Sequence, residues 1–391
     1  MNGKILKKCI VTAVVVVSLA AILTGCGGAG EDSNTIKIGA NLELSGNSAS
    51  YGTSAKNGIE MAVKEINDNG GLLGKKLEIT TADNRSEATE AANAMQKLLD
   101  DKADFIIGPD TSSGSLACVS TADQEQIPMI TPYGTNPDIT VDPNSHSVHP
   151  YAFRTAFIDT FQGKVMSNFV MKNLNAKKAA VYIDNSSDYS KGLQKFFVED
   201  FEKNGGIIVD TEAYLQKDTD FKAALTKIKA ANPDIIFVPG YYQEVGMIIK
   251  QAREMGITQP IVGGDAWDSA KLVEIAGADN LENCYFGNHY SADDTSKTVQ
   301  TFVANYQKAY NQKPDAPAAL AYDSVMILAQ AIKDANSTDK DKVKDALAKI
   351  KGLEAVTGNI TFNENHDPVK SAVILTYKGG KQTFVTKIEP Q

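Results

Sequence analysis

The sequence predicts an α/β fold of two Rossmann-like lobes with parallel sheets, joined by a hinge that the chain crosses several times. Its length of 391 residues is more than one hydrophobic core usually organises. Short apolar runs alternate with segments of helical period, in two separate series. The apolar runs are too continuous for a sheet with one face in water, which indicates parallel sheets covered on both faces.

The first 25 residues form a predicted leader that does not belong to either lobe. Three lysines precede the apolar run 10–23, which is too short to cross a bilayer permanently and is typical of a secretory signal. The run ends in the letters LTGC, which resemble the lipobox of bacterial lipoproteins. We therefore expect Cys26 to carry a lipid and the polar stretch 26–34 to be a tether. The chain is then anchored to the cell membrane from outside the cytoplasm.

Charge and cysteine content exclude several classes of protein. The formal net charge is −9, and removal of the three leader lysines makes it −12, which argues against nucleic-acid binding. Cys118 and Cys284 remain in the folded part, and we predict two free, largely buried thiols, because a disulfide between the lobes would block hinge motion. The pair His146 and His149 lies in a loop rich in Pro, Asn and Ser, which favours a surface loop over a zinc site. We expect no metal and no cofactor.

The elements of the first series follow in order. Residues 36–44 alternate as a strand, and apolar residues at helical spacing then lead to the stop Asn69-Gly70-Gly71. Residues 76–83 form a second strand, followed by a helix that starts near Ser86. The third strand is 104–108, and the fourth is 127–131 after a short helix. The first lobe is predicted to comprise 35–156 and, from the tail, 290–362.

The second series starts near residue 177. Its strands are the segments AAVYID, GIIVDTEAYL, DIIFVPG and PIVGGDA, each separated by a helical segment. The tail gives three helical segments within 296–351, a strand-like segment at 359–362 and a hairpin within 371–388. We expect these segments to complete the two sheets, so that the chain crosses between the lobes near Phe157, His289 and Asn363. The second lobe is then 157–289 with 363–391.

Polar side chains stand just after four predicted strands: Thr111, Ser112 and Ser113; Thr131, Tyr133 and Thr135; Tyr241 and Tyr242; and Asp265. Ligands of open parallel sheets bind beyond the carboxyl ends of the strands. Hydroxyls at a helix N-terminus suit a carboxylate, and an acid with phenols suits an ammonium. A free amino acid carries both groups. Ser112 taken alone would more often be a helix cap.

These residues resemble a known family, the leucine/isoleucine/valine-type substrate-binding proteins of branched-chain amino-acid ABC transporters, which have the periplasmic-binding-protein type I fold. The similarity covers 36–388. The stretches that carry it are 67–71, 112–113, 131–137, 188–192, 240–242, 251–253 with Gly256, and 263–265.

The resemblance implies a role for each matching residue. Ser112 and Thr135 would hold the α-carboxylate, with Ser113 beside them as a further ligand-binding candidate. The backbone carbonyl of Tyr133 and the side chain of Asp265 would hold the α-ammonium. The rings of Tyr51, Tyr189 and Tyr241 would close over the ligand. The family often has Glu at the Asp265 position, and the shorter Asp requires the ligand to sit closer.

Two residues leave the chemical identity of the ligand's side chain undecided. Asp110 stands where leucine-binding members often have an apolar residue, so either it faces away and caps the helix, or the ligand is not simply aliphatic. Trp267 either walls the pocket or belongs to the core.

The resulting hypothesis is a monomeric extracytoplasmic lipoprotein that captures a free amino acid, branched-chain or otherwise apolar, and delivers it to ABC-transporter permease subunits. The alternatives are a ligand-sensing receptor component of the same fold, or a binder of a small amide or aromatic acid. Beyond the predicted leader and tether, the sequence contains no GxSxG, P-loop, GxGxxG or HExxH motif, which argues against an enzyme.

Overall fold

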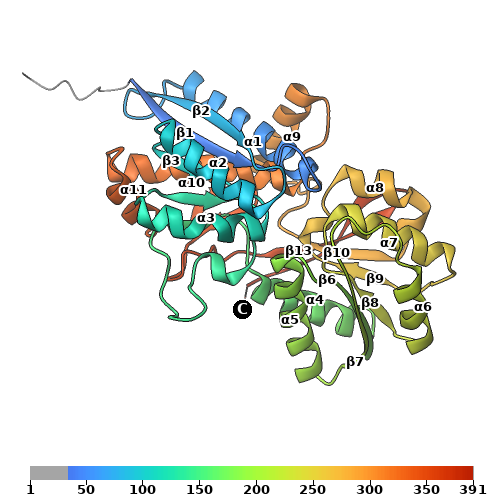
Figure 1. Cartoon of the computed structure of the whole chain (residues 1–391). Coiled ribbons are helices and arrows are strands. Elements are labelled where there is room, and N and C mark those ends of the chain that lie inside the picture. The colour runs from blue at the N-terminus through green and yellow to red at the C-terminus, as the bar shows by residue number, and fades with distance from the viewer. Residues whose placement is uncertain (1–33, 391) are drawn as a thin grey trace, which may run out of the picture. The chain divides into compact units, whose positions relative to one another are not determined.

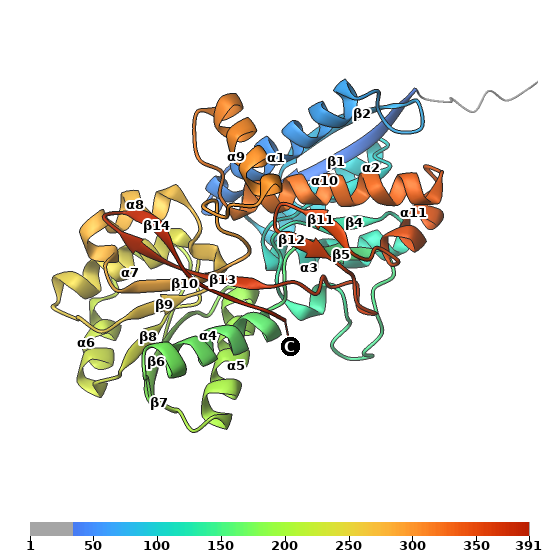
Figure 2. The ribbon, with the colours of Figure 1, turned by 180° about the vertical axis from the view of Figure 1, so that it is seen from behind.

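The computed structural model describes residues 34–390 (Figures 1 and 2). The predicted signal 1–25, the lipidation site Cys26 and all but the last residue of the predicted tether lie outside the described residues. Within residues 34–390, no helix is long and apolar enough to cross a membrane.

The first sheet has five parallel strands in the order β2-β1-β3-β4-β5. In chain order its strands and the helices between them are β1 (Thr35–Leu42), α1 (Ala49–Asp68), β2 (Lys76–Asp83), α2 (Ala88–Asp100), β3 (Phe105–Ile107), α3 (Ser112–Gln124), β4 (Met129–Thr131), η1 (Pro137–Ile139) and β5 (Ala152–Arg154). The four strands predicted from the sequence are all present, and β5 is additional.

The second sheet has seven strands in the order β14-β13-β10-β9-β8-β6-β7. Its first part contains α4 (Asp159–Asn173), β6 (Lys178–Asp184), α5 (Asp188–Lys203), β7 (Ile207–Tyr214), α6 (Lys222–Ala231), β8 (Ile235–Phe237), α7 (Tyr242–Glu254), β9 (Ile261–Gly263), η2 (Asp265–Trp267), α8 (Ala270–Ala276), η3 (Ala278–Leu281) and β10 (Cys284–Asn288). Strands β6 to β10 pair in parallel, and β13 and β14 pair antiparallel. The fold class of two mainly parallel sheets is confirmed.

The tail supplies α9 (Lys297–Tyr310), α10 (Ala316–Ala335), α11 (Lys340–Leu347), β11 (Leu353–Ala355), β12 (Gly358–Ile360), β13 (Ala372–Lys378) and β14 (Lys381–Ile388). The predicted hairpin is β13–β14, and its two-residue turn Gly379–Gly380 has φ of +55° and +75°, a conformation that glycine adopts without strain. Strands β11 and β12 pair only with each other rather than joining a large sheet.

Both faces of the first sheet are covered by helices. Ile36, Ile38 and Phe105 pack with residues of α1, α10 and α11 in one apolar cluster. Ile106 instead points into a second cluster with α2 and α3. Figure 1 looks onto the α2–α3 face, and Figure 2 onto the α10 face. The tail helices therefore complete the first lobe, as the apolar continuity of the strands requires.

The chain passes from the first sheet to the second once, between β5 and β6. It leaves the second sheet between β10 and α9, and it returns to that sheet between β12 and β13. These intervals contain the predicted crossings near Phe157, His289 and Asn363. The exact lobe boundaries, 35–156 with 290–362 and 157–289 with 363–391, stay a prediction.

Candidate functional site

The loops after parallel strands bring the predicted residues together. Strand β3 ends at Ile107, and Gly108 turns the chain toward α3 with φ of +98°. A Cβ atom at Gly108 would lie 2.0 Å from the carbonyl oxygen of Asn41, so only glycine fits this turn. Asp110, Thr111 and α3 follow immediately.

Six of the eight predicted ligand-binding residues line one small cavity of about 10 Å³: Tyr51, Ser112, Tyr133, Tyr189, Tyr241 and Asp265. Asp110 and Ala266 complete its lining. This volume is close to that of a single water molecule. A free amino acid does not fit in it, so the walls must separate to admit one.

Ser113 and Thr135 are not among the cavity-lining residues. The hydroxyl of Ser113 donates a hydrogen bond to Asp188 Oδ2 at 2.9 Å, so it links α3 to α5 of the other lobe. The backbone N–H of Thr135 donates to Ser112 Oγ at 3.3 Å, and its side chain opposes the rise in pKa that burial gives Asp159. Thr135 therefore stands behind Ser112.

Asp265 is held from two sides by hydrogen-bond donors. Its Oδ1 accepts from the hydroxyl of Tyr189, and its Oδ2 contacts Nε2 of His289, each at 2.9 Å. Burial lowers the pKa of His289 to about 4, although Asp265 opposes the shift, so His289 is neutral at pH 7 and donates Nε2–H. The two contacts give the carboxyl group of Asp265 a fixed orientation.

Tyrosine side chains connect the two lobes around this carboxylate. The hydroxyl of Tyr51 donates to the carbonyl of Ala266, and that of Tyr133 donates to the carbonyl of Asp265. The ring of Tyr51 meets those of Tyr133 and Tyr241 edge to face at 5.4 and 5.9 Å, and Tyr189 stacks on Tyr241 at 5.4 Å. Rings from both lobes therefore line the cavity.

The first lobe contributes hydroxyls and the start of a helix. Thr111 is the N-cap of α3, because its side chain accepts a hydrogen bond from the N–H of Gly114 at 3.3 Å. Ser112 is thus free of the capping role, and its Oγ accepts from the N–H groups of Thr135 and Asn136, each at 3.3 Å. The Ser112 proton and the helix N-terminus remain suited to an anion.

The structure decides the two open side-chain questions. The capping interpretation of Asp110 is wrong, because Thr111 holds the cap and Asp110 faces the cavity. Trp267 belongs to the core: it is fully buried, it does not line the cavity, and its Nε1–H donates to the carbonyl of Val238 at 3.1 Å.

Sequence reasoning missed two residues of the site. Glu43 is fully buried and accepts hydrogen bonds from the N–H groups of Asp110 and Thr111, each at 3.1 Å, which fixes the loop after β3. His289 orients Asp265. Both follow strand ends, but Glu43 fell inside the predicted strand 36–44, and β10, which His289 follows, was not predicted as a strand.

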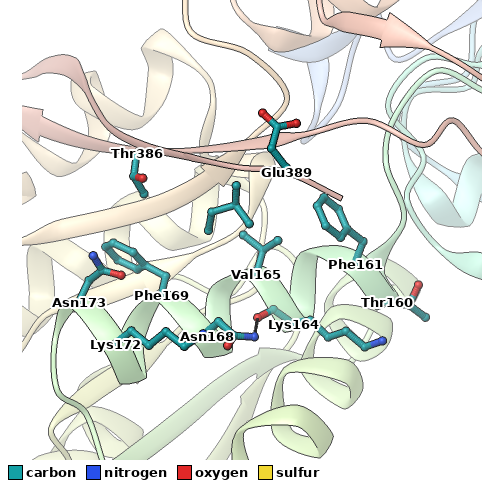
Figure 3. A pocket seen from close by; sticks show the side chains of 11 residues that line it. Thr160, Phe161, Lys164, Val165, Asn168, Phe169, Lys172, Asn173, Thr386 and Glu389 are labelled. Atoms are coloured by element: carbon teal, nitrogen blue, oxygen red, sulfur yellow. Dashed lines mark hydrogen bonds between the residues drawn. The ribbon is translucent and has the colours of Figure 1, made fainter. Parts of the chain in front are cut away.

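Larger hollows lie elsewhere. One of about 360 Å³ lies between α4 and the end of β14, floored by Phe161, Val165 and Phe169 with Lys164 and Lys172 on the same helix (Figure 3). It includes none of the predicted ligand-binding residues. Within the part of the chain described here, no group of three or more His, Cys, Asp or Glu side chains is placed to hold a metal ion.

Comparison with known proteins identifies the class. The periplasmic binding protein family model matches residues 35–382, so the chain belongs to that family of extracytoplasmic, non-enzymatic binding proteins.

Its relatives narrow the class further. A Leu/Ile/Val-binding protein of Rhizobium johnstonii is 31% identical over 85% of this chain and 88% of its own length. A leucine-binding protein of Thermotoga maritima superposes with a TM-score of 0.85 and is 36% identical, covering 91% of this chain and 99% of its own. The substrate-binding protein of a Streptococcus pneumoniae branched-chain amino-acid transporter, solved with isoleucine, has a TM-score of 0.83 and 43% identity, covering 90% of this chain and 99% of its own.

Proposed function

We propose that the chain captures a free branched-chain or similar amino acid between its two lobes and delivers it to the permease subunits of an ABC transporter. The observation that carries the proposal is the meeting of Ser112 and the α3 N-terminus with Asp265 at one cavity. The first pair complements an α-carboxylate and Asp265 complements an α-ammonium. The relatives that bind leucine, isoleucine or valine support the same ligand class.

A thermal-shift panel tests this ligand class. A ligand at about 1,000 times its Kd stabilises the folded state by about 4 kcal/mol, which gives a clear rise in midpoint. The panel contains the common amino acids, urea, short amides and benzoates. We expect branched-chain amino acids to raise the midpoint and urea, the short amides and the benzoates to leave it unchanged. A rise with benzoate or an amide, and with no amino acid, refutes the assignment.

We also propose that Cys26 carries a lipid that anchors the chain to the membrane. The support is the apolar run followed by LTGC, with a polar tether between it and the first strand. Intact mass spectrometry of the protein from membranes tests this. A mature chain starting at an acylated Cys26, which a Cys26→Ala variant lacks, is expected, and an unmodified thiol at Cys26 contradicts it.

A further inference from the structure

The carboxyl group of Asp110 differs from those of Glu43 and Asp265. Asp110 is 1% exposed, and neither of its oxygens has a hydrogen-bond partner among residues 34–390. Glu43, by contrast, accepts three hydrogen bonds from Asp110 and Thr111, and each oxygen of Asp265 has one partner. Burying an unpartnered polar group costs free energy, so such a group calls for a partner from outside the chain.

The position of Asp110 indicates which part of a ligand would supply that partner. Asp110 lines the same cavity as Ser112 and Asp265. If those two residues hold the charged groups on the α-carbon, the ligand's side chain is what remains to meet Asp110. Tyr51 and Tyr241 line the same cavity beside Asp110.

We propose that Asp110 accepts a hydrogen bond from a hydroxyl on the ligand's side chain, so that the site binds threonine at least as tightly as valine. The two amino acids share a β-branched shape, and threonine has a hydroxyl in place of one methyl group. Valine leaves the carboxyl of Asp110 without a partner, whereas threonine satisfies it. This inference rests on the proposed function.

A hydroxyl is a suitable partner for Asp110 in either protonation state of the carboxyl group. Burial raises the pKa of Asp110 well above its ordinary value, and the charges of Glu43 and Asp315 raise it further. A protonated carboxyl offers one acceptor oxygen and one O–H donor, and a hydroxyl can pair with both.

Calorimetry with L-threonine and L-valine on three proteins tests the proposal: wild type, Asp110→Leu and Asp110→Asn. In the wild type we expect the Kd of threonine to equal or fall below that of valine. Asp110→Leu removes the acceptor at similar size and should shift the ratio toward valine by about tenfold or more. Asp110→Asn keeps an acceptor oxygen and should retain most of the wild-type ratio.

Three outcomes overturn the proposal. In the first, the wild type binds threonine over tenfold more weakly than valine, a result that needs no variant. In the second, the ratio is the same in Asp110→Leu, as expected if only water meets the carboxyl. In the third, Asp110→Leu weakens both amino acids equally, which would place Asp110 at the ammonium. If neither of these two amino acids binds the wild type, and leucine and isoleucine do not bind either, the proposed function itself has failed.

Discussion

The two walls of the cavity differ in how their carboxyl groups are held. On the wall from the second lobe, Asp265 receives one hydrogen bond on each oxygen, from Tyr189 and His289. On the wall from the first lobe, the carboxyl group of Asp110 receives none from the residues that the structure describes, although its own N–H donates to Glu43. A carboxylate that is oriented in advance suits a group that every ligand shares, whereas an unpartnered one suits a group that distinguishes ligands.

Removing the oriented carboxylate should give the largest effect. Asp265→Ala leaves an ammonium desolvated without its counter-charge, which should cost about 3–5 kcal/mol of binding free energy. Asp265→Asn is the matched control, since it keeps the shape but loses the charge, and it should lose most of the affinity as well. If calorimetry finds near-native affinity in either variant, Asp265 does not bind the ligand's ammonium group.

The neutral state of His289 predicts a pH dependence of stability. The pKa of His289 is lowered to about 4 in the folded protein, against about 6.5 when unfolded. Between these values the unfolded chain binds a proton that the folded chain does not, so stability falls as pH falls from about 6.5 to 4, by about 3 kcal/mol from this group.

His289→Gln isolates that contribution, because glutamine keeps an N–H donor for Asp265 but does not titrate. Denaturant unfolding at several pH values should show the wild type losing stability relative to the variant below pH 6.5. If the free energies of unfolding of the two proteins change in parallel with pH down to pH 4, the conclusion that His289 is neutral in the folded protein is wrong.

On the opposite wall, Ser112→Ala should cost about 1.5–3 kcal/mol of binding free energy, less than Asp265→Ala, because backbone N–H donors remain beside the ligand's carboxylate. Ser113→Ala is a neighbouring control, since its hydroxyl contacts Asp188 instead of lining the cavity. Calorimetry should show a smaller loss for Ser113. An equal loss of binding free energy in both variants would indicate that Ser113 also contacts the ligand.

The smallest effect concerns the thiols. Cys118 lies in α3 and Cys284 starts β10; both are free and buried, as predicted, and burial raises their pKa values to about 12 and about 11. A reducing agent should therefore leave the thermal midpoint unchanged. Mass spectrometry that detects a Cys118–Cys284 bridge in active protein would contradict both the free thiols and the opening of the lobes.

The sequence predicted most of the fold because apolar periodicity and strand ends are local signals. It missed β5 and did not identify β10 as a strand, and with β10 it missed His289, since a residue is placed at a strand end only when the strand is recognised. The cap of α3 was ambiguous among Asp110, Thr111 and Ser112, because each has a side-chain oxygen that can accept. Only the folded geometry, with Thr111 bonded to Gly114, resolves that choice.

The central claim, that the two walls recognise the two charges of one α-amino acid, is tested most directly by calorimetry of L-valine against its two single-charge analogues. 3-Methylbutanoate lacks the ammonium, and 2-methylpropylamine lacks the carboxylate. We expect both to bind at least about 100-fold more weakly than valine, because each leaves one wall without its counter-charge. Binding of either analogue within a few-fold of valine would contradict the account.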